Sequence, residues 1–244
     1  MEKQLESYEL KKILIFLATL NETENILDLY EQIRSDHKQS AILVIDDSSD
    51  DGTLEKLNKI AEQDKNFTLI VRRQRLGLGS AHFLAFQTAL LRDFDYLVTL
   101  DADFSHNPRY IENLLAESKR FNYIVGTRSK GGGSAYGVLR KFVSKSANLV
   151  CRILIPTSLS EYTNSLRLYD KVALSILVNN PPKDGSYSFF IEVTEILFQN
   201  KLRLGEIPTY FDNRRHGSSK IPKTQILKTI LTIIRLLVNR LRPN

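Results

Sequence analysis

The sequence predicts an α/β fold, in which helices cover both faces of a mostly parallel sheet and an amphipathic helix follows at the C-terminal end. Short, continuously apolar segments such as residues 12–19 and 41–47 alternate with helical patterns, as buried parallel strands do. Polar and charged residues follow these apolar segments directly, where turns are expected. With 244 residues, of which 42% are hydrophobic, the chain is long enough to bury a large core.

Strands are expected throughout the first half of the chain, each an apolar run that ends at polar residues. We expect them at residues 12–19, 41–47, 67–73, 95–101 and 122–127, with helices after residues 19–22, over 54–63, over 77–93 and from about Pro108. In the second half we expect helices over 137–154 and 188–200, an irregular region over 160–170, a strand over 203–211 and a loop over 212–220.

No internal repeat and no low-complexity linker divide the chain. We therefore expect one domain over residues 1–221 and a basic amphipathic helix over residues 222–244. Such a helix can lie in a membrane interface, or it can pack on the domain or on another subunit. The sequence holds no run of 18 apolar residues that would span a bilayer, and residues 1–12 do not resemble a signal peptide.

The net charge of +6 would attract a phosphate-rich ligand, a nucleic acid or an anionic membrane surface. The single cysteine, Cys151, excludes an internal disulfide and a cysteine-built metal site, and suits a reducing compartment. We expect Cys151 to be a small buried residue.

Two acids, Asp101 and Asp103, end the strand expected at residues 95–101. Side chains two apart in a strand share a face, so the two carboxylates can converge on Mg²⁺ or Mn²⁺. In the alternative, Asp103 caps the helix near Pro108 and Asp101 is solvated. Ligands of parallel sheets bind at the carboxyl ends of the strands. These ends are expected to bring together residues 19–22, Asp46, Asp47, Arg72, Arg73, Asp101, Asp103 and Arg128.

Asp46 and Asp47 end the second strand, where a carboxylate can accept hydrogen bonds from a nucleobase or ribose; Asp51 and Thr53 suit the cap of the next helix. The glycine-rich residues 75–82 resemble a phosphate-binding loop. However, the third glycine of a dinucleotide fingerprint is missing and the loop follows the third strand. The glycines are better explained by a tight turn with close backbone approach.

Basic residues are expected opposite the acids. Arg128 follows the fifth strand, and Arg140, Ser144 and Asn148 recur at every fourth position of a helix, which places them on one face. Arg214, Arg215 and Lys220 lie in the loop over 212–220. Arginine suits phosphate because its planar fork donates two parallel hydrogen bonds. His106 could be a metal ligand or a base, but the four histidines form no cluster, which favours a structural or surface role.

Taken as an ordered set, these motifs resemble the family 2 glycosyltransferases of the GT-A (Rossmann-like) fold, and more closely the dolichyl- or polyprenyl-phosphate mannose synthases. The resemblance runs from Ala18 to Lys220 and is carried by residues 18–22, 46–53, 77–81, 101–106, 126–128, by Arg140, Ser144 and Asn148, and by residues 211–220. The chain departs from the family pattern where Ser105 replaces a glutamine, where Asn213 replaces an aspartate, and over Glu161–Arg167, where an aspartate has become Glu161 and a glycine is lost.

The resemblance implies inverting transfer of a hexose, most simply mannose, from a nucleotide diphosphate sugar such as GDP-mannose to a polyprenyl or dolichyl monophosphate. It implies nucleotide binding by Thr19, Glu22, Asp46, Asp47, Asp101, Arg214 and Lys220. It also implies Mg²⁺ or Mn²⁺ held by Asp101, Asp103 and Ser105, and a catalytic set of Asp103, Arg128, Arg140 and Ser144. A lipid acceptor further implies a cytoplasmic protein that is peripheral on the cytosolic face of a membrane, with an anionic membrane surface as partner and no nucleic acid.

Other functions remain open at the level of sequence. The transferase could use another sugar, such as glucose, or another acceptor. The Asp-x-Asp-x-Ser pattern of residues 101–105 also resembles the aspartyl nucleophile motif of haloacid-dehalogenase-type phosphatases, although there it usually ends the first strand. A non-catalytic nucleotide-sugar binding protein is the third possibility, because of Ser105 and the altered residues 161–167.

Overall fold

The computed structural model describes residues 11–183 and 188–216, except for the side chains of residues 138–140, 142 and 143. In its first half, strands and helices alternate as the sequence predicts. They are β1 Ile13–Thr19, α2 Ile26–Asp36, β2 Ala41–Asp46, α3 Thr53–Gln63, β3 Phe67–Val71, α4 Leu78–Leu91, β4 Tyr96–Asp101, α5 Tyr110–Glu117 and β5 Tyr123–Thr127. The second half adds β6 Gly133–Ser134, α6 Val138–Leu154, β7 Arg167–Asp170, α7 Lys171–Asn179, α8 Phe189–Gln199, β8 Leu204–Pro208 and β9 Tyr210–Phe211.

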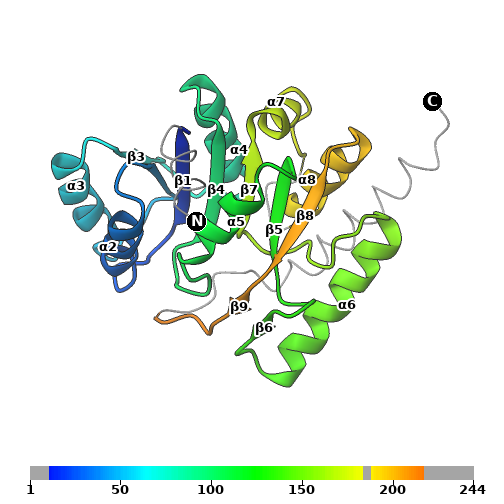
Figure 1. Ribbon diagram of the computed structural model, residues 1–244. Coiled ribbons are helices and arrows are strands. Elements are labelled where there is room, and N and C mark those ends of the chain that lie inside the picture. The colour runs from blue at the N-terminus through cyan, green and yellow to red at the C-terminus, as the bar shows by residue number, and fades with distance from the viewer. Residues whose placement is uncertain (1–10, 184–187, 217–244) are drawn as a thin grey trace.

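The main sheet has seven strands in the order β3-β2-β1-β4-β7-β5-β8 (Figure 1). All its neighbouring pairs are parallel except those that β7 makes with β4 and β5, which are antiparallel. The sheet is therefore mostly parallel, as expected. The chain passes from β1 to β2 and β3 on one side and returns to β4 on the other, so strand order reverses between β1 and β4. Ligands of such sheets bind at this reversal, beyond the carboxyl ends of the strands.

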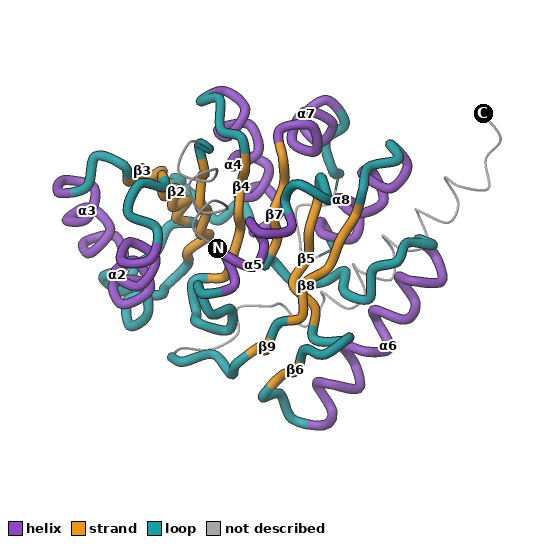
Figure 2. Tube along the Cα trace, in the orientation of Figure 1, coloured by secondary structure: helices purple, strands orange, loops and turns teal. Residues whose placement is uncertain are grey.

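Helices cover both faces of the sheet because alternate strand residues point to opposite sides. In β1, Leu14 and Phe16 join a core with α4, α7 and α8, whereas Ile15 and Leu17 join a second core with α2, α3 and α5. The long helix α6 begins next to the short strand β6 (Figure 2), and its C-terminal part packs against the first of these two cores. Cys151 of α6 is buried, as predicted, in the first of the two cores.

Two of the expectations for the second half are corrected. The region expected to be irregular over 160–170 contains β7, which pairs with both β4 and β5. The strand expected over 203–211 is broken into β8 and β9, which belong to different sheets. Pro208, at the break, has no N–H to donate to a ladder. Among the described residues, no helix is long and apolar enough to cross a membrane; residues 222–244, the expected amphipathic helix, lie outside them.

Candidate active site

The ends of β1 and β2 are joined by a buried aspartate. Thr19 donates its hydroxyl hydrogen bond to Oδ2 of Asp46 at 2.8 Å, and Ser49 donates to the same carboxylate through its backbone N–H (2.8 Å) and its hydroxyl (2.6 Å). Asp46 is completely buried. Its oxygens therefore shape the turn after β2, at the edge where Asp46 was expected to meet a nucleotide.

Asp47 holds the glycine-rich loop. Its carboxylate accepts hydrogen bonds from the backbone N–H groups of Leu76 (2.8 Å) and Gly77 (2.9 Å), and Arg72 pairs with it at 2.9 Å. Gly77 has a φ of +88°, a conformation that side chains disfavour, and α4 begins at the next residue. The loop is thus a tight turn fastened to the end of β2, as the sequence predicts.

The two acids at the carboxyl end of β4 have different surroundings. Asp103 is buried, and its Oδ2 lies 2.9 Å from Nη2 of Arg214; the same guanidinium reaches Oε1 of Glu22 through Nη1 at 2.9 Å. Asp101 keeps 38% of its side chain exposed and accepts a hydrogen bond from the Ser165 hydroxyl at 2.5 Å. Glu22, Asp101, Asp103 and Arg214, brought together from opposite ends of the chain, form the carboxylate cluster.

The pKa values of the two acids move in opposite directions. Partial desolvation by the surrounding protein raises the pKa of Asp101, although 38% of its side chain stays exposed, and the charge of Asp103 adds to this effect. Burial also acts to raise the pKa of Asp103, but the Arg214 cation and the hydrogen bonds from Ser105 outweigh it and lower that pKa. Asp103 is therefore the more firmly ionised of the two, because it has the arginine as its partner.

Ser105 and His106 support the two acids. The backbone N–H of Ser105 donates to Oδ1 of Asp103 at 2.9 Å. Nδ1 of His106 accepts the backbone N–H of Asp101 at 3.2 Å, and the buried His106 ring packs edge-on against Phe211 with centroids 4.6 Å apart. This is the structural role that the sequence favoured for His106. The alternative for Asp103 is wrong, because α5 begins at Tyr110 and has no side-chain cap.

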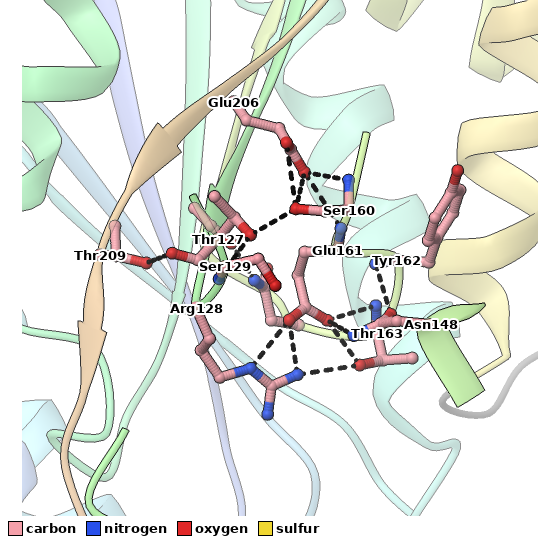
Figure 3. A network of polar contacts seen from close by, with 12 residues as sticks. Thr127, Arg128, Ser129, Asn148, Ser160, Glu161, Tyr162, Thr163, Glu206 and Thr209 are labelled. Carbon is pink, nitrogen blue, oxygen red and sulfur yellow. Dashed lines mark hydrogen bonds and ion pairs between the residues drawn. The ribbon is translucent and has the colours of Figure 1, made fainter. Parts of the chain in front are cut away.

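A second polar network surrounds Arg128 at the end of β5 (Figure 3). Nε and Nη2 of Arg128 donate to Oε2 of Glu161 at 2.8 and 2.6 Å, and Nδ2 of Asn148 on α6 donates to Oε1 of Glu161 at 3.0 Å. The chain turns tightly after Arg128, since a Cβ on Gly132 would lie 2.2 Å from the Thr127 carbonyl oxygen. The structure thus joins Arg128 and Asn148, which the sequence placed on the same side of the site.

Arg167 holds the segment that carries Glu161 and Ser165 through hydrogen bonds to its backbone. This guanidinium is fully buried and donates to the carbonyl oxygens of Tyr162 and Asn164, both at 2.7 Å. Burial lowers the pKa of Arg167 to about 10. One buried cation therefore fixes a loop that makes two contacts. Ser165 of this loop reaches Asp101 in the carboxylate cluster, and Glu161 of the same loop reaches Arg128.

The remaining predicted residues lie elsewhere or outside the description. Arg140 and Ser144 both belong to α6, but the Arg140 side chain is not described, and Ser144 is half-buried. Arg73 is exposed, two residues beyond the end of β3. Lys220 lies outside the described residues. In the described part of the chain, no three His, Cys, Asp or Glu side chains are arranged to hold a metal by themselves. An ion at Asp101 and Asp103 would therefore need further ligands from substrate or water.

Sequence reasoning missed the contributions of Glu161, Ser165 and Glu206. The first two had been noted only as departures from a family pattern, and that mismatch was the available signal. Glu206 gave no signal, because it lies in an ordinary strand and meets Ser160 only in the folded chain.

Comparisons with known proteins agree with this geometry. The chain is 28% identical over 226 residues to undecaprenyl-phosphate mannosyltransferase of Micrococcus luteus, covering 92% of this chain and 93% of that protein. It is 29% identical over 227 residues to polyprenol monophosphomannose synthase of Mycolicibacterium smegmatis, covering 91% and 86%. Glucosyl-3-phosphoglycerate synthase of Mycobacterium tuberculosis, solved with Mn²⁺, UDP and phosphoglyceric acid, superposes with a TM-score of 0.70 at 18% identity, covering 100% of this chain and 84% of that one.

The fold is accordingly the GT-A fold that the sequence predicted. The phosphatase alternative is not supported, since the Asp-x-Asp pattern follows the fourth strand and the family match is to a transferase. The model of the family described as "Glycosyl transferase family 2" matches residues 14–177, and the chain belongs to this family of glycosyltransferases.

Proposed function

We propose that this glycosyltransferase transfers mannose from GDP-mannose to a polyprenyl monophosphate, with inversion at the sugar carbon. The observation that carries the proposal is that two polar sites, the carboxylate cluster and the network around Arg128, both reach the ring of Phe211. The Phe211 ring packs against His106, which contacts Asp101, and the guanidinium carbon of Arg128 lies 5.0 Å from the same ring. The names of the two curated relatives support mannose as the sugar and a polyprenyl phosphate as the acceptor.

The carboxylate cluster is the proposed donor side. Asp101 and Asp103 offer oxygen ligands, and Mg²⁺ or Mn²⁺ commonly binds through one or two carboxylates while substrate phosphates and waters complete its shell. The residues present therefore fit such an ion, in keeping with the Mn²⁺ and UDP of the structural neighbour. Bound there, the ion would neutralise charge on the leaving diphosphate. Ser105 was expected to be a ligand, but its backbone hydrogen bond to Asp103 supports a positioning contribution.

The other donor-side residues act on the nucleotide and on charge. Thr19, Asp46 and Asp47 shape the ends of β1 and β2, where the nucleoside is proposed to bind. Lys220, which lies outside the described residues, is proposed to bind the same nucleotide. Arg214 stands beside Asp103 and Glu22, so its cation is proposed to stabilise negative charge as the diphosphate departs.

The acceptor side is proposed to be Arg128 together with Arg140 and Ser144 of α6. A phosphate monoester is already anionic near neutral pH, so it needs orientation more than a general base. One of its oxygens attacks the anomeric carbon and forms the new C–O bond. The bond from that carbon to the diphosphate oxygen breaks, and both of its electrons leave with the nucleoside diphosphate.

A lipid acceptor requires work at a membrane surface, and we propose a peripheral protein on the cytosolic face. Residues 222–244 are proposed as an interfacial helix separate from the catalytic domain of residues 1–221. Leu149, Val150 and Ile153 on α6 are 59%, 42% and 71% exposed, and they add an apolar strip. Arg152 on the same helix is exposed, and a basic residue near an anionic surface contributes about 1 kcal/mol.

A second candidate is transfer of glucose to a small phosphorylated acid. The structural neighbour's name and its complex with UDP and phosphoglyceric acid favour it. The same carboxylate cluster and the same Arg128 would serve a soluble acceptor, which needs no membrane contact.

Incubation with Mn²⁺, a short polyprenyl phosphate and a panel of GDP- and UDP-sugars, with mass spectrometry of the lipid fraction, tests the proposal. We expect mannosyl lipid from GDP-mannose and its loss in Asp103→Ala. A glucosylated phosphoglycerate from UDP-glucose, with no lipid product, would instead support the second candidate.

A further inference from the structure

Glu161 is the centre of the network at the proposed acceptor side. It is 1% exposed, and its carboxylate accepts hydrogen bonds from three separate parts of the chain (Figure 3). Besides Arg128 and Asn148, the Thr163 hydroxyl donates to Oε1 at 2.8 Å, and the Thr163 backbone N–H donates to it at 3.2 Å. A buried carboxylate with this many donors is held in one orientation and holds its partners in turn.

The guanidinium of Arg128 is restrained on several sides. Glu161 takes two of its nitrogens, and the rings of Tyr136 and Phe211 lie 5.8 and 5.0 Å from its central carbon. Among the described residues, none accepts a hydrogen bond from the third nitrogen, Nη1, and Figure 3 shows this nitrogen pointing away from Glu161. The side chain is 16% exposed. Arg128 therefore presents one fixed donor edge.

A second buried carboxylate supports the same segment without touching Arg128. Glu206 on β8 accepts hydrogen bonds from the Ser160 hydroxyl at 3.0 Å and the Glu161 backbone N–H at 3.0 Å, and Lys130 pairs with it at 2.8 Å. The two glutamates thus have different tasks. Glu206 holds the backbone of the loop, whereas Glu161 holds the side chains of Arg128 and Asn148.

We propose that Glu161 is a positioning residue that fixes Arg128 so that Nη1 meets the phosphate of the acceptor. This inference rests on the proposed function. The negative charge of Glu161 reduces the attraction of this site for the acceptor phosphate. However, Glu161 already restricts the rotamers of Arg128 before the acceptor binds, so less conformational entropy is lost on binding. Affinity for the acceptor then depends on the direction of the guanidinium as well as on its charge.

The first test measures binding of farnesyl phosphate, as a short polyprenyl phosphate, by calorimetry in the presence of GDP and Mn²⁺. We expect Glu161→Gln to weaken binding about tenfold or more, as loss of a buried charged hydrogen-bond partner does, with unchanged affinity for GDP. Glu161→Asp keeps the charge and should recover most of the affinity. The matched control Glu206→Gln should lower the melting temperature yet leave farnesyl phosphate affinity within about twofold. An equal loss in Glu206→Gln would mean that Glu161 merely supports the loop.

The second test asks whether Glu161 acts through Arg128. In an Arg128→Ala background, Glu161→Gln should cause no further loss, because interacting residues are non-additive; additive losses would overturn the inference. Arg128→Lys keeps the positive charge, but an ammonium group cannot donate the paired hydrogen bonds that the guanidinium makes to Glu161. Wild-type affinity for farnesyl phosphate in this variant would therefore overturn the inference, even if Glu161→Gln did not fold. If the wild-type protein itself binds no farnesyl phosphate, the proposed acceptor class is wrong. If wild type and Glu161→Gln bind it equally well, the acceptor class stands and the positioning role of Glu161 is wrong.

Discussion

Arg214 bridges Glu22 and Asp103, with Nη1 2.9 Å from the glutamate and Nη2 2.9 Å from the aspartate. The contact brings the segment after β9 onto the ends of β1 and β4. The contact also explains how Asp101 and Asp103 can lie close together at the end of β4, because the Arg214 cation offsets the negative charge of Asp103. The bridge raises the pKa of Arg214 even though burial acts to lower it.

Removal of this bridge should impair transfer. We expect Arg214→Ala to lower kcat/KM by about a hundredfold, because a fixed donor to the developing charge is lost, and Arg214→Lys to retain part of the activity. Steady-state kinetics with GDP-mannose measures the effect. The control is Arg215→Ala, whose partner Asp28 is more than half exposed. Similar losses in the Arg214 and Arg215 variants would contradict a specific task for Arg214.

Asp47 should matter for both stability and nucleotide binding. In Asp47→Asn, one carboxylate oxygen becomes an NH₂ group that cannot accept the N–H of Leu76 or Gly77. We expect a loss of about 2 kcal/mol in the free energy of unfolding and weaker GDP binding, measured by urea titration and calorimetry. Asp50→Asn is the matched control, since that side chain is 74% exposed. Equal stability of the two variants would refute the prediction.

His82 should make stability depend on pH. It is buried among the rings of Phe16, Phe189 and Phe190, and burial lowers its pKa to about 3 from an ordinary value of 6.5. Between these two values the unfolded chain binds the proton and the folded chain does not, so stability falls as pH falls from 6.5 towards 3. The slope from this one group is about 1.4 kcal/mol per pH unit.

The measurement is urea unfolding across that pH window. His82→Phe and His82→Gln differ in packing, but neither titrates, so both should lose this part of the slope whatever their absolute stability. An unchanged slope in both variants would show that other groups produce the acid sensitivity.

The apolar strip of α6 should contribute to membrane binding. We expect Leu149→Glu with Ile153→Glu to reduce co-sedimentation with anionic vesicles, and deletion of residues 223–244 to reduce it further, because both changes remove apolar or basic interfacial contacts. Leu91→Glu is the control, since Leu91 is 89% exposed on α4, away from α6. The proposed membrane contact fails if the control reduces binding as much as the α6 variant, or if neither the α6 variant nor the deletion reduces it.

The alternation of strands and helices, and the edge of the sheet at which the polar residues gather, could be predicted from the amino-acid sequence. Apolar runs that end in acids, as at Asp46 and Asp101, carry this information locally, because alternation and turn chemistry depend only on neighbouring residues. The glycine loop at Gly77 was predictable for the same reason. Where the pattern was weak, prediction failed: β7 is four residues long and begins with the buried Arg167, which no strand pattern indicates.

Which charged side chains pair with one another follows from the folded arrangement of the chain and could not be predicted from the sequence. Arg214 pairs with Asp103 and Glu22, and Arg128 pairs with Glu161. Other basic residues lie close to both arginines in the sequence, and the sequence does not indicate which of them pairs with these acids. Such pairs depend on the order of the strands and on segments far apart in the chain. Their strength depends on burial, which exists only after the sheet and its covering helices have formed.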